Sequence, residues 1–146
     1  MVISCFVEAN HVGNRITCHS HTGIILFCNP APIIWFAKCQ NTVETSTFGS
    51  EFIAARIAVK LIESLCYKLH MFGIPIDGPA NKFCDNNGVV INSTHPESTL
   101  KKKHNAIAYH RTREADVANT VRIAKEDSRT NIVDFLTKSL TGPSSV

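Results

Sequence analysis

The sequence predicts an α/β protein in which helices flank a five-stranded mixed sheet. Three apolar stretches of strand length come first along the chain, at residues 2–7, 22–28 and 33–38, and short turns separate them. A long segment with helical periodicity follows, and strand-like and helix-like segments alternate after it. Short turns between strands predict an antiparallel meander, and the later alternation predicts a sheet with helices on its faces.

A central helix is predicted from the spacing of apolar residues within residues 41–69. They recur at three- and four-residue steps, at Phe52, Ala55, Val59, Ile62, Leu65 and Leu69. This spacing is typical of a helix with one buried face. Ser and Thr residues just upstream are suited to cap the first turn, and we expect Glu51 to lie in that turn, where the helix dipole favours a negative charge.

The second half of the sequence predicts two more strands and further helices. Residues 81–85 and 120–125 have strand patterns, whereas residues 86–91, 101–117 and 131–140 are compatible with helices. Asn131 is the expected N-cap of the last helix, with Asp134 at the third position of a capping-box-like pair. The predicted order is β-β-β-α-β-α-β-α, with the brief helix at residues 86–91 in addition.

Length and composition predict one domain over residues 1–146, with a first strand shortened at the N-terminus and a loose tail at 141–146. No apolar run approaches the roughly 20 residues of a membrane span, so no membrane partner is expected. Six cysteines without a C-x-x-C pair predict free thiols in a reducing, intracellular compartment, with cytoplasm and nucleus both open.

Positive charge is concentrated in the last third of the chain. Residues 1–100 carry 6 Lys and Arg against 7 Asp and Glu, whereas residues 101–146 carry 9 against 5. A basic end on an otherwise neutral domain predicts either a surface that faces phosphates or an ordinary solvated face.

Four carboxylates fall near the ends of predicted elements. They are Glu8 after the first strand, Glu51 at the start of the central helix, Asp85 after the fourth strand and Asp134 at the start of the last helix. A crossover helix would bring strand four beside strand one, and ligand sites gather at the carboxyl ends of such strands. Converging carboxylates favour Mg²⁺ or Mn²⁺, and two such ions can hydrolyse a phosphodiester. Taken singly, each acid is more often a cap or turn residue than a metal ligand.

Four runs of sequence together span nearly the whole chain and carry a family resemblance. They are RITCHSHTGIILFCNPAPIIWFAKCQNTVETSTFGSEF, FGIPIDGPANKFCDNNGVV, KKKHNAIAYHRTREA and NIVDFLTKSL. With their S-H-T-G, T-S-x-x-x-S-E, C-D-N and D-x-L-T-K motifs, they resemble the ribonuclease H (RNase H) domain of copia-type retrotransposon polyproteins. The resemblance implies an RNase H-like fold and metal-dependent hydrolysis of the RNA strand of RNA–DNA hybrids during reverse transcription. It also implies a reverse transcriptase domain upstream in the parent polyprotein.

The resemblance also implies a catalytic set. The family's metal-binding acids match Glu51, Asp85 and Asp134, and Glu8 stands where the family has its first Asp. These four residues are therefore expected to hold two Mg²⁺ or Mn²⁺ ions. Glu8 is one methylene longer than Asp, and a misplacement of about 1 Å at a reacting centre can cost roughly 100-fold in rate. In the family the first strand usually ends in an Asp-Ala-Asp motif. Asn10 stands in place of the second Asp of that motif.

The basic segment supplies the expected contacts to a nucleic acid. Lys102, Arg111 and Arg113 are expected to face the backbone of a bound duplex, because Lys and Arg contact phosphates without reading sequence. Asn86, next to Asp85, is a candidate to contact a sugar hydroxyl. Two functions remain open on the sequence: a ribonuclease H-type endonuclease, or a degenerate element relic that folds and at most binds nucleic acid. The residue at position 8 keeps enzyme activity uncertain.

Overall fold

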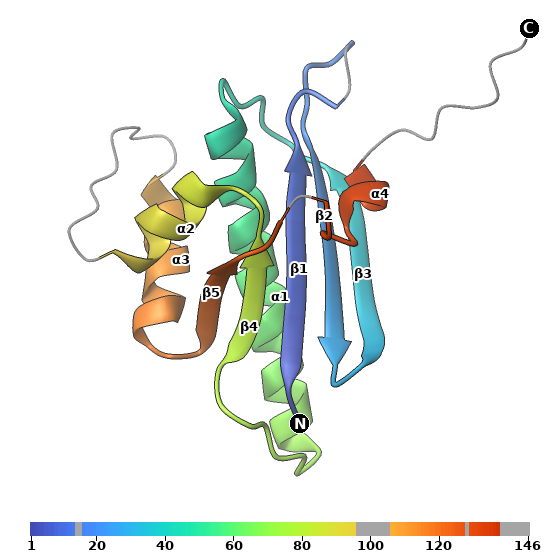
Figure 1. Ribbon diagram of the computed structural model, residues 1–146, viewed down its shortest axis with the longest axis vertical. Coiled ribbons are helices and arrows are strands. Elements are labelled where there is room, and N and C mark those ends of the chain that lie inside the picture. The colour runs from blue at the N-terminus through green and yellow to red at the C-terminus, as the bar shows by residue number, and fades with distance from the viewer. Residues whose placement is uncertain (14–15, 96–105, 128, 138–146) are drawn as a thin grey trace, which may run out of the picture.

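The computed structural model describes residues 1–13, 16–95, 106–127 and 129–137. Five strands form one sheet, in the order β3-β2-β1-β4-β5 (Figure 1). The strands are β1 (Ile3–Asn10), β2 (His21–Cys28), β3 (Ala31–Cys39), β4 (Ala80–Cys84) and β5 (Val121–Lys125). The helices are α1 (Thr47–Met71), α2 (Asn87–Thr94), α3 (Ala106–Val117) and α4 (Asp134–Thr137).

The sheet is mixed, as the sequence predicts. β1, β2 and β3 form an antiparallel meander, and β4 runs parallel to both β1 and β5. The crossover through α1 places β4 directly beside β1, which confirms the predicted neighbourhood of strands one and four. A parallel neighbour aligns the carboxyl ends of the two strands at one edge of the sheet.

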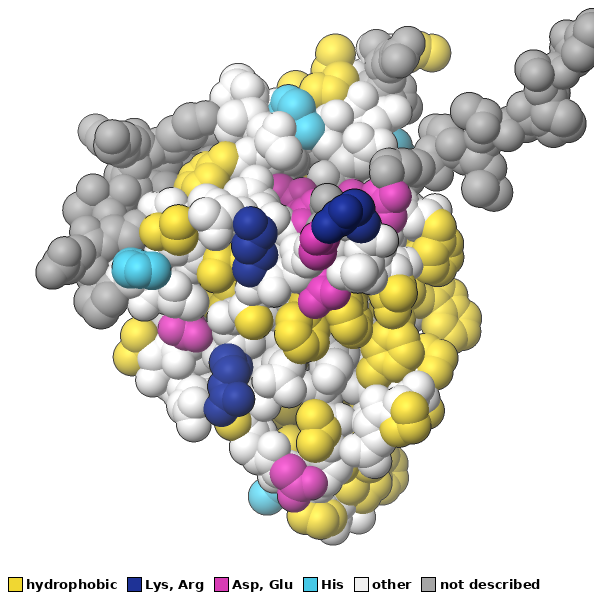
Figure 2. Space-filling view, in the orientation of Figure 1, with side chains coloured by type: hydrophobic (Ala, Val, Ile, Leu, Met, Phe, Trp, Pro, Cys, Tyr) yellow, Lys and Arg dark blue, Asp and Glu magenta, His cyan; other side chains and the backbone are white. Residues whose placement is uncertain are grey.

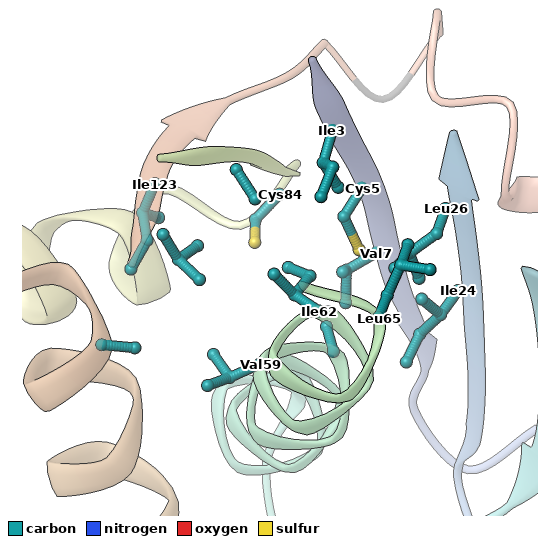
Figure 3. Close-up of a cluster of buried hydrophobic side chains, with 14 of the residues drawn as sticks. Ile3, Cys5, Val7, Ile24, Leu26, Val59, Ile62, Leu65, Cys84 and Ile123 are labelled. Carbon is teal, nitrogen blue, oxygen red and sulfur yellow. The ribbon is translucent and has the colours of Figure 1, made fainter. Parts of the chain in front are cut away.

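Helix α1 covers one face of the sheet and supplies much of the core. It begins after Ser46, whose side chain accepts a hydrogen bond from the Gly49 N–H group at 3.2 Å. The predicted apolar face is confirmed: Phe52, Ala55, Val59, Ile62 and Leu65 are buried, and Leu69 packs against the core. Figure 3 shows Ile62 and Leu65 facing Cys5 and Val7 of β1 across this layer.

Helix α4 lies on the opposite face of the sheet, over β2 and near β1 (Figure 1). Alternation along β2 explains this arrangement, because Ile24 and Leu26 point into the core whereas Gly23 faces the other way and meets α4. The same outer face carries Phe6, which stacks on Phe83 with ring centroids 5.0 Å apart. The two sides of the sheet are therefore unequal, with one under α1 and the other largely open except at α4.

Several element boundaries differ from the predictions. β1 continues past Glu8 to Asn10, because β2 keeps pairing with it as far as Asn10 and His21. β3 begins at Ala31 and includes Pro32, which an edge strand tolerates because Pro needs no ladder partner there. The predicted position of Glu51 in the first turn is wrong: α1 starts at Thr47, so Glu51 lies one turn further along.

The last helix also begins later than predicted, at Asp134. Asn131 does not act as its N-cap. Its Oδ1 accepts the Val133 N–H group at 3.2 Å and closes a turn ahead of the helix. Residues 138–140 of the predicted helix, the predicted tail at 141–146 and residues 101–105 of the other predicted helix lie outside the described residues. Within the described part of the chain, no helix combines the length and the hydropathy that crossing a membrane requires.

Candidate active site

The acids Glu8 and Asp85 lie side by side at the edge where β1 and β4 end their parallel pairing. Val7 is the last residue of β1 to pair with β4, opposite Cys84, so Glu8 and Asp85 are the next residue on each strand. Figure 2 shows acidic side chains gathered on the outer face of the molecule in this region, with basic side chains beside them. The structure thus brings together two of the four predicted acids through backbone pairing alone.

Glu51 reaches the same edge from α1, on the other side of the sheet. Its Oε1 accepts a hydrogen bond from the Ala9 N–H group at 3.1 Å, and only 4% of the residue is exposed. Burial, then the negative charges of Asp85 and Glu8, raise the pKa of Glu51 to about 8, although the Ala9 N–H group and the Lys82 charge oppose them. A proton therefore resides on Glu51 at neutral pH when no cation is bound.

Asp85 links Glu8 and Glu51 to the fourth acid, Asp134. Burial, followed by the charge of Asp134, raises the pKa of the half-buried Asp85, and the Asn86 N–H group and Lys125 act in the opposite direction. The charge of Asp134 thus raises the pKa of Asp85, and the charges of Asp85 and Glu8 raise the pKa of Glu51. The four carboxylates form one electrostatically coupled group at this edge of the sheet, which we call the acid cluster (Glu8, Glu51, Asp85 and Asp134).

Two asparagines fasten the segment that carries Asp134 to β1. The Asn131 side-chain amide donates to the Val7 carbonyl at 3.3 Å, and the Asn10 side-chain amide donates to the Thr137 carbonyl at 2.9 Å. The Asp134 N–H group itself donates to the Asn131 carbonyl at 3.2 Å. Asp134 is therefore held from both sides of its short helix.

Gly23 makes room for this helix on the sheet. It pairs with Glu8 across the β1–β2 ladder. A Cβ atom at position 23 would lie 2.7 Å from Thr137 Cγ2 and 2.8 Å from Val133 Cγ1, closer than side-chain carbons can pack. The glycine of the S-H-T-G motif thus has a packing role, which the sequence pattern alone did not reveal.

No protein-family model matches the sequence. Solved structures do match, at low identity. LC11-RNase H1, isolated from compost, is 12% identical over 92% of this chain and 91% of its own, with a TM-score of 0.69. The N-terminal RNase H domain of a Mycobacterium tuberculosis protein is 10% identical over 92% and 89%, with a TM-score of 0.70. The foamy viral protease-reverse transcriptase is 13% identical over 93% of this chain and 19% of its own, with a TM-score of 0.65. The fold is that of ribonuclease H.

The RNase H fold accounts for the shape of the site, and the donor atoms must be judged on this chain's own residues. Four carboxylates offer the oxygen ligands that Mg²⁺ and Mn²⁺ prefer, so the donor types fit the expected ions. Among the described residues, however, no three His, Cys, Asp or Glu side chains are already placed to bind one metal ion together. Metal binding by these four acids stays a prediction.

The residues predicted to contact nucleic acid all have structural partners where they are described. Arg111 forms ion pairs with Glu63 of α1 and, at 3.0 Å, with Glu114 of its own helix. Arg113 donates to the Tyr109 hydroxyl group at 2.7 Å and lies over the ring of the same tyrosine. The Arg111–Glu63 ion pair joins α3 to α1, whereas the contacts of Arg111 with Glu114 and of Arg113 with Tyr109 lie within α3.

Asn86 is the N-cap of α2 in this RNase H fold. Its Oδ1 accepts the Val89 N–H group at 3.3 Å, which satisfies a donor in the first turn of the helix. Its predicted contact with a sugar hydroxyl stays a prediction. Lys102 lies outside the described residues.

Sequence reasoning missed one charged residue near the site. Lys82 lies in the middle of β4 and is fully buried. The signal was present in the sequence, because a lysine interrupts the apolar positions of the strand ANKFC at a place where alternation predicts a core side chain. The roles of Asn10 and Asn131 were also missed, because each depends on a contact with a distant part of the chain.

Proposed function

We propose that this chain is the RNase H domain of a copia-type retrotransposon and that it hydrolyses the RNA strand of RNA–DNA hybrids. The observation that carries the proposal is the placement of Glu8 beside Asp85 at the ends of two parallel strands, with Glu51 bonded to β1 next to them. The RNase H fold and the copia-like sequence runs support it. LC11-RNase H1 and the foamy viral protease-reverse transcriptase, both similar in fold, have each been solved with an RNA/DNA hybrid.

The acid cluster is the part of the chain that would do the chemistry. Glu8, Glu51, Asp85 and Asp134 would hold two Mg²⁺ or Mn²⁺ ions, which when bound supply an activated water and stabilise the leaving oxygen of a phosphodiester. Because burial keeps a proton on Glu51 near neutral pH, loading the site must release that proton. Asn10 and Asn131 would keep Asp134 in position.

A larger polyprotein is the expected context. The RNase H-like part of the foamy viral protease-reverse transcriptase that matches this chain is 19% of that protein. By the copia resemblance, we propose a reverse transcriptase domain as the partner upstream of this one. The duplex-facing residues would be Lys102, Arg111, Arg113 and Asn86.

The decisive experiment follows cleavage of a hybrid labelled on its RNA strand, with Mg²⁺ or Mn²⁺ present. We expect slow cleavage by the natural sequence and a gain of up to roughly 100-fold in Glu8→Asp, since the shorter side chain returns the carboxylate to the length that the family uses. Asp85→Asn should abolish cleavage. Asp77→Asn is the matched control, because Asp77 is an exposed acid that pairs with the N-terminal amine at the other end of the strands.

A specific observation also favours the second candidate, a relic that folds and binds nucleic acid without cleaving it. Asn10 occupies the position of a second acid and uses its N–H group as a donor to Thr137, a bond that an ionised Asp cannot make. Hybrid binding measured by fluorescence anisotropy, with no metal-dependent cleavage even in Glu8→Asp, would select the relic and reject the enzyme.

A further inference from the structure

Lys82 is a buried cation close behind the acid cluster. The residue has no exposed surface, and within the described part of the chain its Nζ has no hydrogen-bond partner. Its neighbours across the sheet are Cys5 on β1 and Ile123 on β5, which are buried as well. An ammonium group in such surroundings is strongly unfavourable unless an opposite charge compensates for it.

The direction of the Lys82 side chain shows which acid shares its side of the sheet. Lys82 and Cys84 alternate with outward residues along β4, so both point to the side of the sheet that α1 covers. Glu51 enters the acid cluster from that same side. The Lys82 charge lowers the pKa values of Glu51, Cys5 and Cys84, but burial keeps both thiols protonated. Glu51 is therefore the member of the acid cluster that shares this side of the sheet with Lys82.

We propose that Lys82 is an internal cation whose positive charge opposes the binding of divalent metal ions at the acid cluster. The inference rests on the proposed two-ion site. A metal ion that binds at Glu51 brings two positive charges toward Lys82. Even when it displaces the Glu51 proton, one net positive charge is added beside a fixed ammonium, so the repulsion opposes loading. Lys82 would act on the site without touching the metal.

The test compares metal binding by the natural sequence with that of Lys82→Met, which removes the charge and keeps an unbranched side chain. Isothermal titration calorimetry with Mn²⁺ and with Mg²⁺ gives the affinity, and the metal-dependent shift of the melting temperature gives a second readout that needs no catalysis. We expect Lys82→Met to bind Mn²⁺ about tenfold or more tightly than the natural sequence. Lys60→Met is the control, since Lys60 is exposed on α1. The Mn²⁺ affinity of this variant should stay within about twofold of that of the natural sequence.

Equal affinities in Lys82→Met and the natural sequence would overturn this inference and leave the two-ion site intact. If neither protein binds metal in either readout, the two-ion site itself fails, and the role of Lys82 fails with it. Lys82→Ile provides a second apolar replacement with a different shape. Failure of both apolar variants to fold would also overturn the inference, because Lys82 would then be needed for the fold and not for tuning the site.

Discussion

The side-chain amide of Asn10 donates a hydrogen bond to the backbone carbonyl of Thr137, and the two residues are 127 positions apart in the chain. This bond holds the end of α4 against the end of β1, and α4 begins with Asp134. Asn10 therefore helps to hold Asp134 in position.

Replacing Asn10 with aspartate should loosen α4. Asn10→Asp replaces the donor with a carboxylate that faces a carbonyl oxygen, so we expect a loss of about 1–3 kcal/mol in the free energy of unfolding. Urea denaturation measures the loss, and hydrogen exchange should show faster exchange in α4. Asn81→Asp is the control, because Asn81 lies on β4 at a distance from α4 along the strand. Equal losses in both variants would contradict the role of the Asn10 bond.

Adding a methyl group at Gly23 should push α4 off the sheet. Gly23→Ala would place its Cβ 2.7 Å from Thr137 Cγ2, and overpacking of this kind costs about 1–3 kcal/mol. We expect a lower melting temperature. We also expect a loss of hybrid cleavage, since Asp134 moves with the helix. Ala37→Ser, at the exposed β3 neighbour of Gly23, should change neither. An unaltered melting temperature in Gly23→Ala would show that α4 does not depend on this close approach.

Stability should fall as pH rises from about 4.5 to about 8, because the folded state holds a proton on Glu51 that the unfolded chain releases. The raised pKa means that the contribution is fully present below about pH 4.5 and is lost by the time pH passes about 8. The slope is at most about 1.4 kcal/mol per pH unit. Chemical denaturation across this range measures it.

Glu51→Gln should flatten that profile and be more stable than the natural sequence above about pH 8. Asp77→Asn, an exposed acid far from the acid cluster, should keep the full slope. A slope that survives in Glu51→Gln would assign the proton to another group.

Removing the Arg111 charge tests the proposed duplex surface. If Arg111 contacts a phosphate, Arg111→Met should weaken hybrid binding several-fold and reduce the salt-dependence slope by about 1. Glu63→Gln is the matched control, because it breaks the same ion pair and leaves the arginine in place. Binding that is unchanged in Arg111→Met would limit this residue to joining α3 and α1, where such a pair contributes about 0–1 kcal/mol.

The parts of the fold that depend on local pattern could be predicted from the sequence. Apolar spacing in residues 52–69 marked the buried face of α1, and the crossover helix predicted that the fourth strand lies beside the first. The start of α1 was harder, because several Ser and Thr residues compete as caps and only packing selects Ser46. That choice placed Glu51 one turn further along than expected.

The remaining features of the site arise from contacts between distant residues. Nothing near Asn10 in sequence indicates that Thr137 will lie opposite it, and nothing near Gly23 indicates that α4 will pack there. Lys82 was readable as an interruption of an apolar strand, but its significance depends on the carboxylate that α1 brings to the same side. Periodicity predicts which face of an element is buried. It does not predict which charged residues lie together on that face.

The hydrogen bond between Ala9 and Glu51 gives this glutamate a structural role that does not depend on catalysis. Where β4 stops pairing, the backbone N–H group of Ala9 is buried and needs an acceptor, and Glu51 Oε1 is that acceptor. The fold would lose stability without an oxygen at position 51, whether or not the chain cleaves RNA. Selection for folding alone can therefore preserve Glu51, so the presence of this acid does not by itself indicate activity.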